Sequence, residues 1–311
     1  MTEAILFSLA GLILLLLGSN FLVSSTERFS NTYRISGFIA SFFIIGIATS
    51  APEIFISIES ALLDQTILAI GNAIGSNLSN IALVFAISIF FIPKESNSSA
   101  LPRNAYMGMI ILTLSMFLLI RFDSLFSIVD ALILLVLFLG ILFVLDKHNN
   151  AKDYQAIKYD MRFNLLKIIF LVLSGIILLV YGSGYFIYGA TQIALFYGIS
   201  SYVIGLTLTA LGTSLPELTV SIQSARKGKV DFVIGNIIGS NIFNIAIAMS
   251  IAGLISSSMV TVADFTRDIM FLLIASSVFY LIIKSDKIFI KTVYSSLLVI
   301  TYLVYVSFIL G

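Results

Sequence analysis

Two short stretches decide how this chain is organised, Thr49-Ser50-Ala51-Pro52-Glu53 and Thr213-Ser214-Leu215-Pro216-Glu217. Each one places a proline and a carboxylate inside a long apolar segment. After the same gap, each is followed by a second polar cluster, which runs from Gly71 to Asn80 in the first case and from Gly235 to Asn244 in the second. Placing an ionisable group in an apolar membrane segment costs free energy, so the presence of such groups here indicates a functional site.

The composition predicts a membrane protein. Of the 311 residues, 59% are hydrophobic and 11% are charged, whereas a soluble domain is about half apolar and about a quarter charged. Apolar runs of roughly 20 residues, long enough to cross a bilayer, recur along the whole chain. We therefore expect an all-α polytopic membrane protein. Its expected surroundings are the lipid bilayer, and no nucleic-acid partner is expected. The absence of cysteine excludes disulfides and thiolate metal sites.

The apolar pattern predicts ten membrane-spanning helices, at residues 4–24, 36–63, 67–92, 104–120, 125–145, 164–188, 200–226, 230–255, 266–283 and 289–310. Because the N-terminus lacks the basic region of a signal peptide, the first apolar run is predicted to be the first span. The segment 146–163 is predicted to be a charged linker between two halves, 1–145 and 164–311. It carries His148, the only histidine, for which a solvated position is the simplest expectation.

The basic residues predict the orientation in the membrane, since Lys and Arg are enriched in cytoplasmic loops. With ten spans, 15 of the 17 basic residues fall on one side, and only Arg121 and Arg267 fall on the other. Both termini are therefore expected outside the cell and the linker 146–163 in the cytoplasm.

The two halves are related by a duplication. Glu217 follows Glu53 by 164 residues, and the same offset aligns Asn244 with Asn80. About half of the aligned pairs between residues 46 and 83 are identical, which is a strong sign of an internal repeat. Since each half holds five predicted spans, the second half must enter the membrane from the opposite side. Inverted repeats of this kind meet at a midplane binding site in transporters.

The prolines predict interrupted helices. Pro52 and Pro216 lack an N–H group and clash with the carbonyl four residues earlier, so spans two and seven are expected to break; spans three and eight are also expected to be broken. Backbone carbonyls freed inside a membrane are tolerated where they line a cavity. A dehydrated cation such as Ca²⁺ takes oxygen ligands of this kind.

The polar residues around the breaks form a pattern that suits a hard cation. Glu53 and Glu217 supply charge, and no Lys or Arg lies at comparable depth. Hydroxyl and amide side chains spaced by three or four residues share helix faces with one another, namely Ser57, Ser60, Asn72, Ser76 and Asn80 with their counterparts Ser221, Ser224, Asn236, Ser240 and Asn244.

Structural explanations compete for several of these residues. The glycines at 71, 75, 235 and 239 are expected to permit close helix packing. The asparagines at 72, 77, 236 and 241 would either contribute to the site or bond freed backbone groups. Glu59 lies about 240° around its helix from Glu53 at roughly 100° per residue, so it faces away from the site. For Glu53 and Glu217 the alternative is a protonated structural carboxyl group.

The paired motifs resemble the membrane region of sodium/calcium exchangers, within the cation/Ca²⁺ antiporters and of the prokaryotic type. The resemblance rests on Thr-Ser-x-Pro-Glu, at Thr49 and Thr213, and on Gly-Asn-x-x-Gly-Ser-Asn, at Gly71 and Gly235. It implies a prokaryotic plasma membrane location and a sliding pair made by the first and sixth spans, at Gly18 and Gly182. For Ca²⁺ the resemblance implies a site made by Glu53, Glu217 and the carbonyls of Thr49 and Thr213. For Na⁺ it implies positions around Ser50, Ser76, Ser214, Ser240 and the carbonyls of Gly46 and Ala210. It places Asn80 and Asn244 beside the central position.

One departure from the family leaves the coupling open. Many members carry Asp at one of the positions held here by Asn80 and Asn244. Two carboxylates give a maximum charge of −2, which matches one Ca²⁺, two Na⁺ or two protons. We expect a monomeric antiporter that exchanges Na⁺ for Ca²⁺ by alternating access to one site, with no cofactor besides the transported ions.

Three other functions compete with Na⁺/Ca²⁺ exchange. In a Ca²⁺/H⁺ antiporter the two glutamates would be protonated in place of Na⁺ loading, and burial favours the neutral form of a carboxyl group. A channel would need a continuous pore. Two carboxylates deep in the membrane are better suited to holding an occluded ion than to lining such a pore. An enzyme is the least favoured, since no nucleophile with an adjacent base is recognisable.

Overall fold

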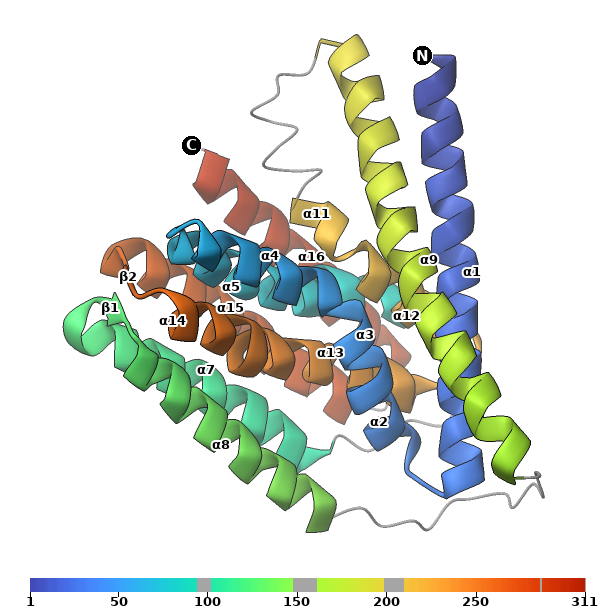
Figure 1. The fold of residues 1–311 in the computed structure, drawn as a ribbon, viewed down its shortest axis with the longest axis horizontal. Coiled ribbons are helices and arrows are strands. Elements are labelled where there is room, and N and C mark those ends of the chain that lie inside the picture. Colours follow the sequence, from blue (N-terminus) through green and yellow to red (C-terminus); the bar gives the residue numbers. More distant parts are fainter. Residues whose placement is uncertain (94–101, 148–160, 199–209, 286, 311) are drawn as a thin grey trace.

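Helices make up almost all of the computed structural model, which describes residues 1–93, 102–147, 161–198, 210–285 and 287–310 (Figure 1). The only strands in this part of the chain are β1 (Leu125–Phe126) and β2 (Ser258–Met259), which form one short antiparallel pair. In chain order, the helices of the first half are α1 (Thr2–Tyr33), α2 (Gly37–Ala40), the π-helix η1 (Ser41–Ile45), α3 (Gly46–Thr49), α4 (Ala51–Leu62), α5 (Thr66–Ser79), the π-helix η2 (Asn80–Phe85), α6 (Ala86–Ile89), α7 (Arg103–Asp123) and α8 (Ile128–Lys147).

The second half follows the same order. It consists of α9 (Met161–Phe196), α11 (Ala210–Thr213), α12 (Leu215–Arg226), α13 (Val230–Phe243), the π-helix η4 (Asn244–Met249), α14 (Ser250–Ile255), α15 (Val262–Lys284) and α16 (Ile288–Leu310). Residues 148–160, with most of the predicted linker and His148, lie outside the described residues. So do residues 199–209, the first half of the seventh predicted span.

The described helices are long and apolar enough for an integral membrane protein. Eight of them could cross a bilayer, or nine if the bent pair over 37–62 counts as one span. The two spans that carry the asparagine clusters are the most enclosed of the described spans, because 67% of the most apolar window in Thr66–Ile89 and 83% of that in Val230–Ile255 is buried. These two spans therefore form the centre of the molecule, and the remaining helices pack around them.

The prediction that the third and eighth spans are broken is wrong. Residues 66–89 and 230–255 each form one continuous span, and each contains a π-helical segment, η2 and η4, that starts at an asparagine. Neither stretch contains a proline, so nothing removes a backbone donor. A widened π-helical turn is instead the local adjustment, and such turns are frequent at functional sites.

Helices α1 and α9 are longer than the predicted spans 4–24 and 164–188. They have 32 and 36 residues, so at about 1.5 Å per residue each is roughly 50 Å long, against about 30 Å of hydrocarbon. They run antiparallel, side by side, across one flank of the other helices (Figure 1). Glycines bring their backbones together: a Cβ on Gly18 would lie 2.9 Å from the carbonyl oxygen of Gly175, and one on Gly11 would lie 2.7 Å from that of Gly182.

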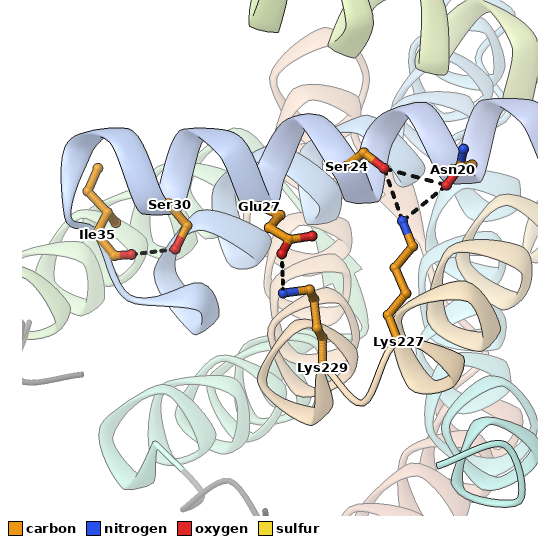
Figure 2. A network of polar contacts seen from close by, with 7 residues as sticks. All are labelled: Asn20, Ser24, Glu27, Ser30, Ile35, Lys227 and Lys229. Carbon is orange, nitrogen blue, oxygen red and sulfur yellow. Dashed lines mark hydrogen bonds and ion pairs between the residues drawn. The ribbon is translucent and has the colours of Figure 1, made fainter. Parts of the chain in front are cut away.

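Polar contacts attach the lower part of α1 to the turn between α12 and α13 (Figure 2). The Lys229 ammonium pairs with the Glu27 carboxylate at 2.8 Å. The Lys227 ammonium donates to the Asn20 side-chain oxygen and to the Ser24 hydroxyl, both at 3.0 Å. These bonds explain why α1 continues as a helix past the predicted end at residue 24, since its polar last turns have partners on the core.

Candidate functional site

The two Thr-Ser-x-Pro-Glu stretches lie at helix interruptions. Helix α3 ends at Thr49 and α4 begins at Ala51, with a bend of 45° between the two helical segments. Likewise, α11 ends at Thr213 and α12 begins at Leu215. In each case the proline occupies the first turn of the new helix, where its missing N–H would have no partner anyway.

This geometry puts Glu53 and Glu217 in the first turns of α4 and α12. The N-terminal end of a helix carries a partial positive charge that favours an anion nearby. Both glutamates are completely buried. Glu59, further along α4, is exposed, as its predicted position on another face requires.

The two carboxylates have no partner of their own. Among the described residues, none of their four oxygens accepts a hydrogen bond and no Lys or Arg pairs with them. The two groups do face each other closely enough for electrostatic repulsion, and Ser76 lies beside Glu53 while Thr49 lies beside Glu217. An unpaired buried charge costs several kcal/mol, so these two groups need a cation or protons.

Four asparagines at the centre bond each other in a reciprocal pattern. The Asn77 amide donates to the Asn241 backbone carbonyl at 3.0 Å, and the Asn241 amide donates to the Asn77 carbonyl at 3.2 Å. Asn80 then donates to the Asn241 side-chain oxygen at 3.1 Å, and Asn244 donates to that of Asn77 at 3.0 Å. Each of these bonds joins the first half of the chain to the second.

This network fixes which way Asn80 and Asn244 point. Because each amide nitrogen donates across the interface, each side-chain oxygen is directed elsewhere. Both oxygens are buried and lack a hydrogen-bond partner among the described residues. They are therefore available as ligands, which a sequence cannot show because an asparagine can turn either its oxygen or its nitrogen toward a site.

Some of the unpartnered buried oxygens are matched between the halves. The matched ones are one serine hydroxyl, two carboxylate oxygens and one amide oxygen in each half, from Ser50, Glu53 and Asn80 in the first and from Ser214, Glu217 and Asn244 in the second. Five further serine hydroxyls without a partner have no unpartnered counterpart, namely those of Ser57, Ser79, Ser224, Ser250 and Ser295. The helix carrying Glu53 packs against η4, and the helix carrying Glu217 packs against η2. No group of three or more His, Cys, Asp and Glu side chains occurs in the described residues. A bound cation would thus rest on two carboxylates and several neutral oxygens, the ligand type of Ca²⁺.

One side of this centre is closed by direct contacts between the halves. The Thr49 hydroxyl lies 3.0 Å from the Asn236 side-chain oxygen and 3.1 Å from the Ser240 hydroxyl, which in turn lies 3.5 Å from the Gly46 carbonyl. Gly239 allows this approach, because a Cβ there would lie 2.7 Å from the Phe42 carbonyl oxygen. Thr49, Gly46 and Ser240, all predicted site residues, are thereby brought together.

The counterpart contacts on the other side are only partly described. No described atom lies within 4 Å of a Cβ built on Gly71 or Gly75, the counterparts of Gly235 and Gly239, but the segment 199–209, which corresponds to the segment 35–45 that packs on Gly235 and Gly239, lies outside the described residues. The amide nitrogen of Asn72 lacks a hydrogen-bond partner among the residues described, whereas Asn236 donates to the Ser221 hydroxyl at 2.9 Å. The described residues of the two sides therefore differ at Asn72 and Asn236.

The roles of the asparagines divide in a way that the sequence left open. Asn77 and Asn241 do bond backbone carbonyls, and they also orient Asn80 and Asn244. Asn236 bonds the Glu217 carbonyl at 3.3 Å, whereas Asn72 makes no such bond among the described residues. The repeat offset of 164 relates Asn77 to Asn241, but it relates Asn72 to Asn236 and Asn80 to Asn244 as well, so the structure was needed to show which pair bonds reciprocally.

Replacing Asn241 with alanine is expected to destabilise the protein by about 1–3 kcal/mol. The change leaves the Asn80 side-chain amide without its partner, and one buried unsatisfied group costs about 1–3 kcal/mol. The Asn77 carbonyl keeps the hydrogen bond from the Asn80 backbone N–H. Thermal unfolding followed by circular dichroism measures this. Ser277→Ala is the control, because that exposed hydroxyl bonds only its own helix. Equal midpoints for the two variants would show that the asparagine network adds no stability.

Comparison with known proteins identifies the fold around this site. The model of the family described as "Sodium/calcium exchanger protein" matches residues 3–145 and 167–311. The chain belongs to the sodium/calcium exchanger family. The resemblance seen in the paired motifs is therefore confirmed over both halves, and this family consists of transmembrane cation antiporters.

Individual members of the exchanger family agree over most of the length. The putative antiporter CaxA of Alkalimonas amylolytica is 34% identical over 86% of each chain. The sodium/calcium exchanger MaX1 of Methanosarcina acetivorans is 27% identical over 81% of this chain and 83% of its own. Among solved structures, the sodium-calcium exchanger NCX_Mj superposes with a TM-score of 0.81 at 30% identity, and 99% of each chain is covered.

Proposed function

We propose that this exchanger moves Ca²⁺ in one direction and Na⁺ in the other by alternating access to a single central site. The observation that carries the proposal is the matched set of buried oxygens without partners, from Ser50, Glu53 and Asn80 and from Ser214, Glu217 and Asn244, in which no Lys or Arg of the described residues neutralises the two carboxylates. One Ca²⁺ or two Na⁺ would balance the charge of −2. Coupling then follows because the two loads compete for the same carboxylates.

The ligands proposed for Ca²⁺ are the carboxylates of Glu53 and Glu217 with the carbonyls of Thr49 and Thr213. The proposed Na⁺ positions are those implied by the family resemblance. They lie at the serines and at the two backbone carbonyls of the paired breaks, with the oxygens of Asn80 and Asn244 at the centre. The free orientation of those two amide oxygens supports the last assignment.

We further propose ten spans arranged as two inverted halves, 1–145 and 164–311. Supporting this, the partners of the reciprocal asparagine bonds are related by the repeat offset, 164 residues. The glycine contacts between α1 and α9 follow the same symmetry, because the pair Gly11–Gly182 maps onto the pair Gly175–Gly18.

The distribution of basic residues supports an orientation with the loops after α1 and α12 in the cytoplasm and both termini outside. In this orientation the packed contacts at Gly235 and Gly239 lie on the cytoplasmic side of the site.

Flux in sealed vesicles tests the function. Vesicles containing the purified protein are loaded with Na⁺, and ⁴⁵Ca²⁺ is added outside, with and without a proton ionophore. Uptake is expected to follow the outward Na⁺ gradient and to be unaffected by the ionophore. Uptake that follows pH and ignores Na⁺ would instead establish the Ca²⁺/H⁺ antiporter, in which the same two glutamates carry protons. Uptake with neither gradient would indicate a channel.

A further inference from the structure

A second feature outside the ion site has the properties of a binding site. A cavity of about 320 Å³ lies between the α1/α9 pair and the segment that leads to the first helix break. Every residue that lines it is apolar, including Phe29 of α1, Phe43 of η1, Ala48 of α3, and Leu165, Ile169 and Ile176 of α9. A cavity with no polar group offers water no partner, so its natural occupant is a hydrocarbon.

The cavity has the length of one lipid tail. Its α9 wall extends from Leu165 to Ile176, and eleven residue steps at about 1.5 Å each give roughly 16 Å. This is about half of the roughly 30 Å hydrocarbon core of a bilayer. It begins where the predicted sixth span begins, at the membrane interface. Leu165 and Ile169 are 40% and 44% exposed, so the cavity is reachable from the surrounding lipid.

Two basic residues are sequence neighbours of residues that line the cavity. Arg28 directly precedes the lining residue Phe29, and Lys167 directly precedes Ile168. Both basic residues are exposed, and neither forms an ion pair with any described residue. The one nearby carboxylate on α1, Glu27, is paired with Lys229 (Figure 2).

We propose that this cavity binds one acyl chain of an anionic phospholipid, with its headgroup phosphate between Arg28 and Lys167. Basic residues near the membrane surface attract anionic lipids, by about fivefold each. The tail would lie against Ile47 and Ala48, directly before Thr49 of the ion site. It would thus fill the space between the α1/α9 pair and the helix that carries the break. The proposal does not depend on which ions are exchanged.

Tryptophan fluorescence tests the proposal without background, because the chain has no tryptophan. A single reporter, Phe43→Trp, is placed in the cavity wall, with Phe29→Trp as a second reporter at its mouth in case the first does not fold. Phe170→Trp is the control, since Phe170 is 67% exposed on α9, which forms one wall of the cavity, and does not itself line the cavity. Each folded variant is reconstituted in phosphatidylcholine vesicles containing increasing fractions of phosphatidylglycerol with brominated tails, which quench nearby tryptophan.

The cavity reporter is expected to be half-quenched at a brominated phosphatidylglycerol fraction at least fivefold lower than that of brominated phosphatidylcholine. For Phe170→Trp the two lipids should quench alike. Adding Arg28→Gln and Lys167→Gln should remove the preference of the cavity reporter and leave the control unchanged. The proposal is overturned if the cavity reporter is not quenched, if it behaves like Phe170→Trp, or if both brominated lipids quench it equally.

Discussion

Replacing either Glu53 or Glu217 with glutamine is expected to lower Na⁺-dependent Ca²⁺ uptake by about 10²- to 10³-fold. Each carboxylate is fully buried and has no partner among the described residues, so in the proposed function its charge is compensated by the transported ion. Removing one partner of a buried charge pair costs about 3–5 kcal/mol, and about 1.4 kcal/mol corresponds to a factor of ten in affinity.

The measurement is initial ⁴⁵Ca²⁺ uptake into Na⁺-loaded vesicles at matched protein content. Glu59→Gln is the matched control, because it makes the same chemical change on the same helix, α4, at an exposed position. It should retain the flux of the unmodified protein. Retained flux in Glu53→Gln or Glu217→Gln would remove that residue from the proposed site, provided that the variant reconstitutes normally.

Replacing Gly239 with alanine is expected to destabilise this conformation by about 1–3 kcal/mol, the usual cost of overpacking. A Cβ there would lie 2.7 Å from the Phe42 carbonyl oxygen, and neither backbone segment can turn away as a flexible side chain would. The aligned change on the other side of the site, Gly75→Ala, meets no described atom within 4 Å. It should leave the stability of this conformation unchanged.

Two measurements separate packing from transport in these variants. Thermal unfolding followed by circular dichroism should show a lower midpoint for Gly239→Ala only. Flux should fall in both, because alternating access in an inverted repeat requires the Gly75 side to close in turn as the Gly239 side is closed here. Normal flux in Gly75→Ala would argue against a symmetric closure on that side.

The local chemistry of the site could be anticipated because it depends on residue type and spacing. A proline without an N–H starts a helix more readily than it continues one, so the interruptions next to Pro52 and Pro216 follow from the sequence. Glu53 is buried and Glu59 is exposed because six residue steps turn them to different faces of one helix. The repeat offset likewise relates Asn77 to its partner Asn241, although it does not distinguish this pair from the other repeated asparagines.

Other features depend on contacts between distant segments. Helices α1 and α9 are longer than the apolar pattern predicts. For α1 the reason is that its polar last turns find partners on the α12–α13 turn. The predicted breaks in spans three and eight are π-helical turns instead. The direction of the Asn80 and Asn244 oxygens was set by amide bonds across the interface.

The sequence by itself determined the family, the membrane character and the two carboxylates, because apolar periodicity and a duplicated motif are properties of the chain alone. Only the tertiary structure decided how the two halves meet at the site. Gly235 and Gly239 pack against the backbone of Phe38 and Phe42, and the amides of Asn77 and Asn241 bond each other's backbone carbonyls. Local sequence cannot specify these contacts, because they arise from the relative position of helices that are far apart in the chain.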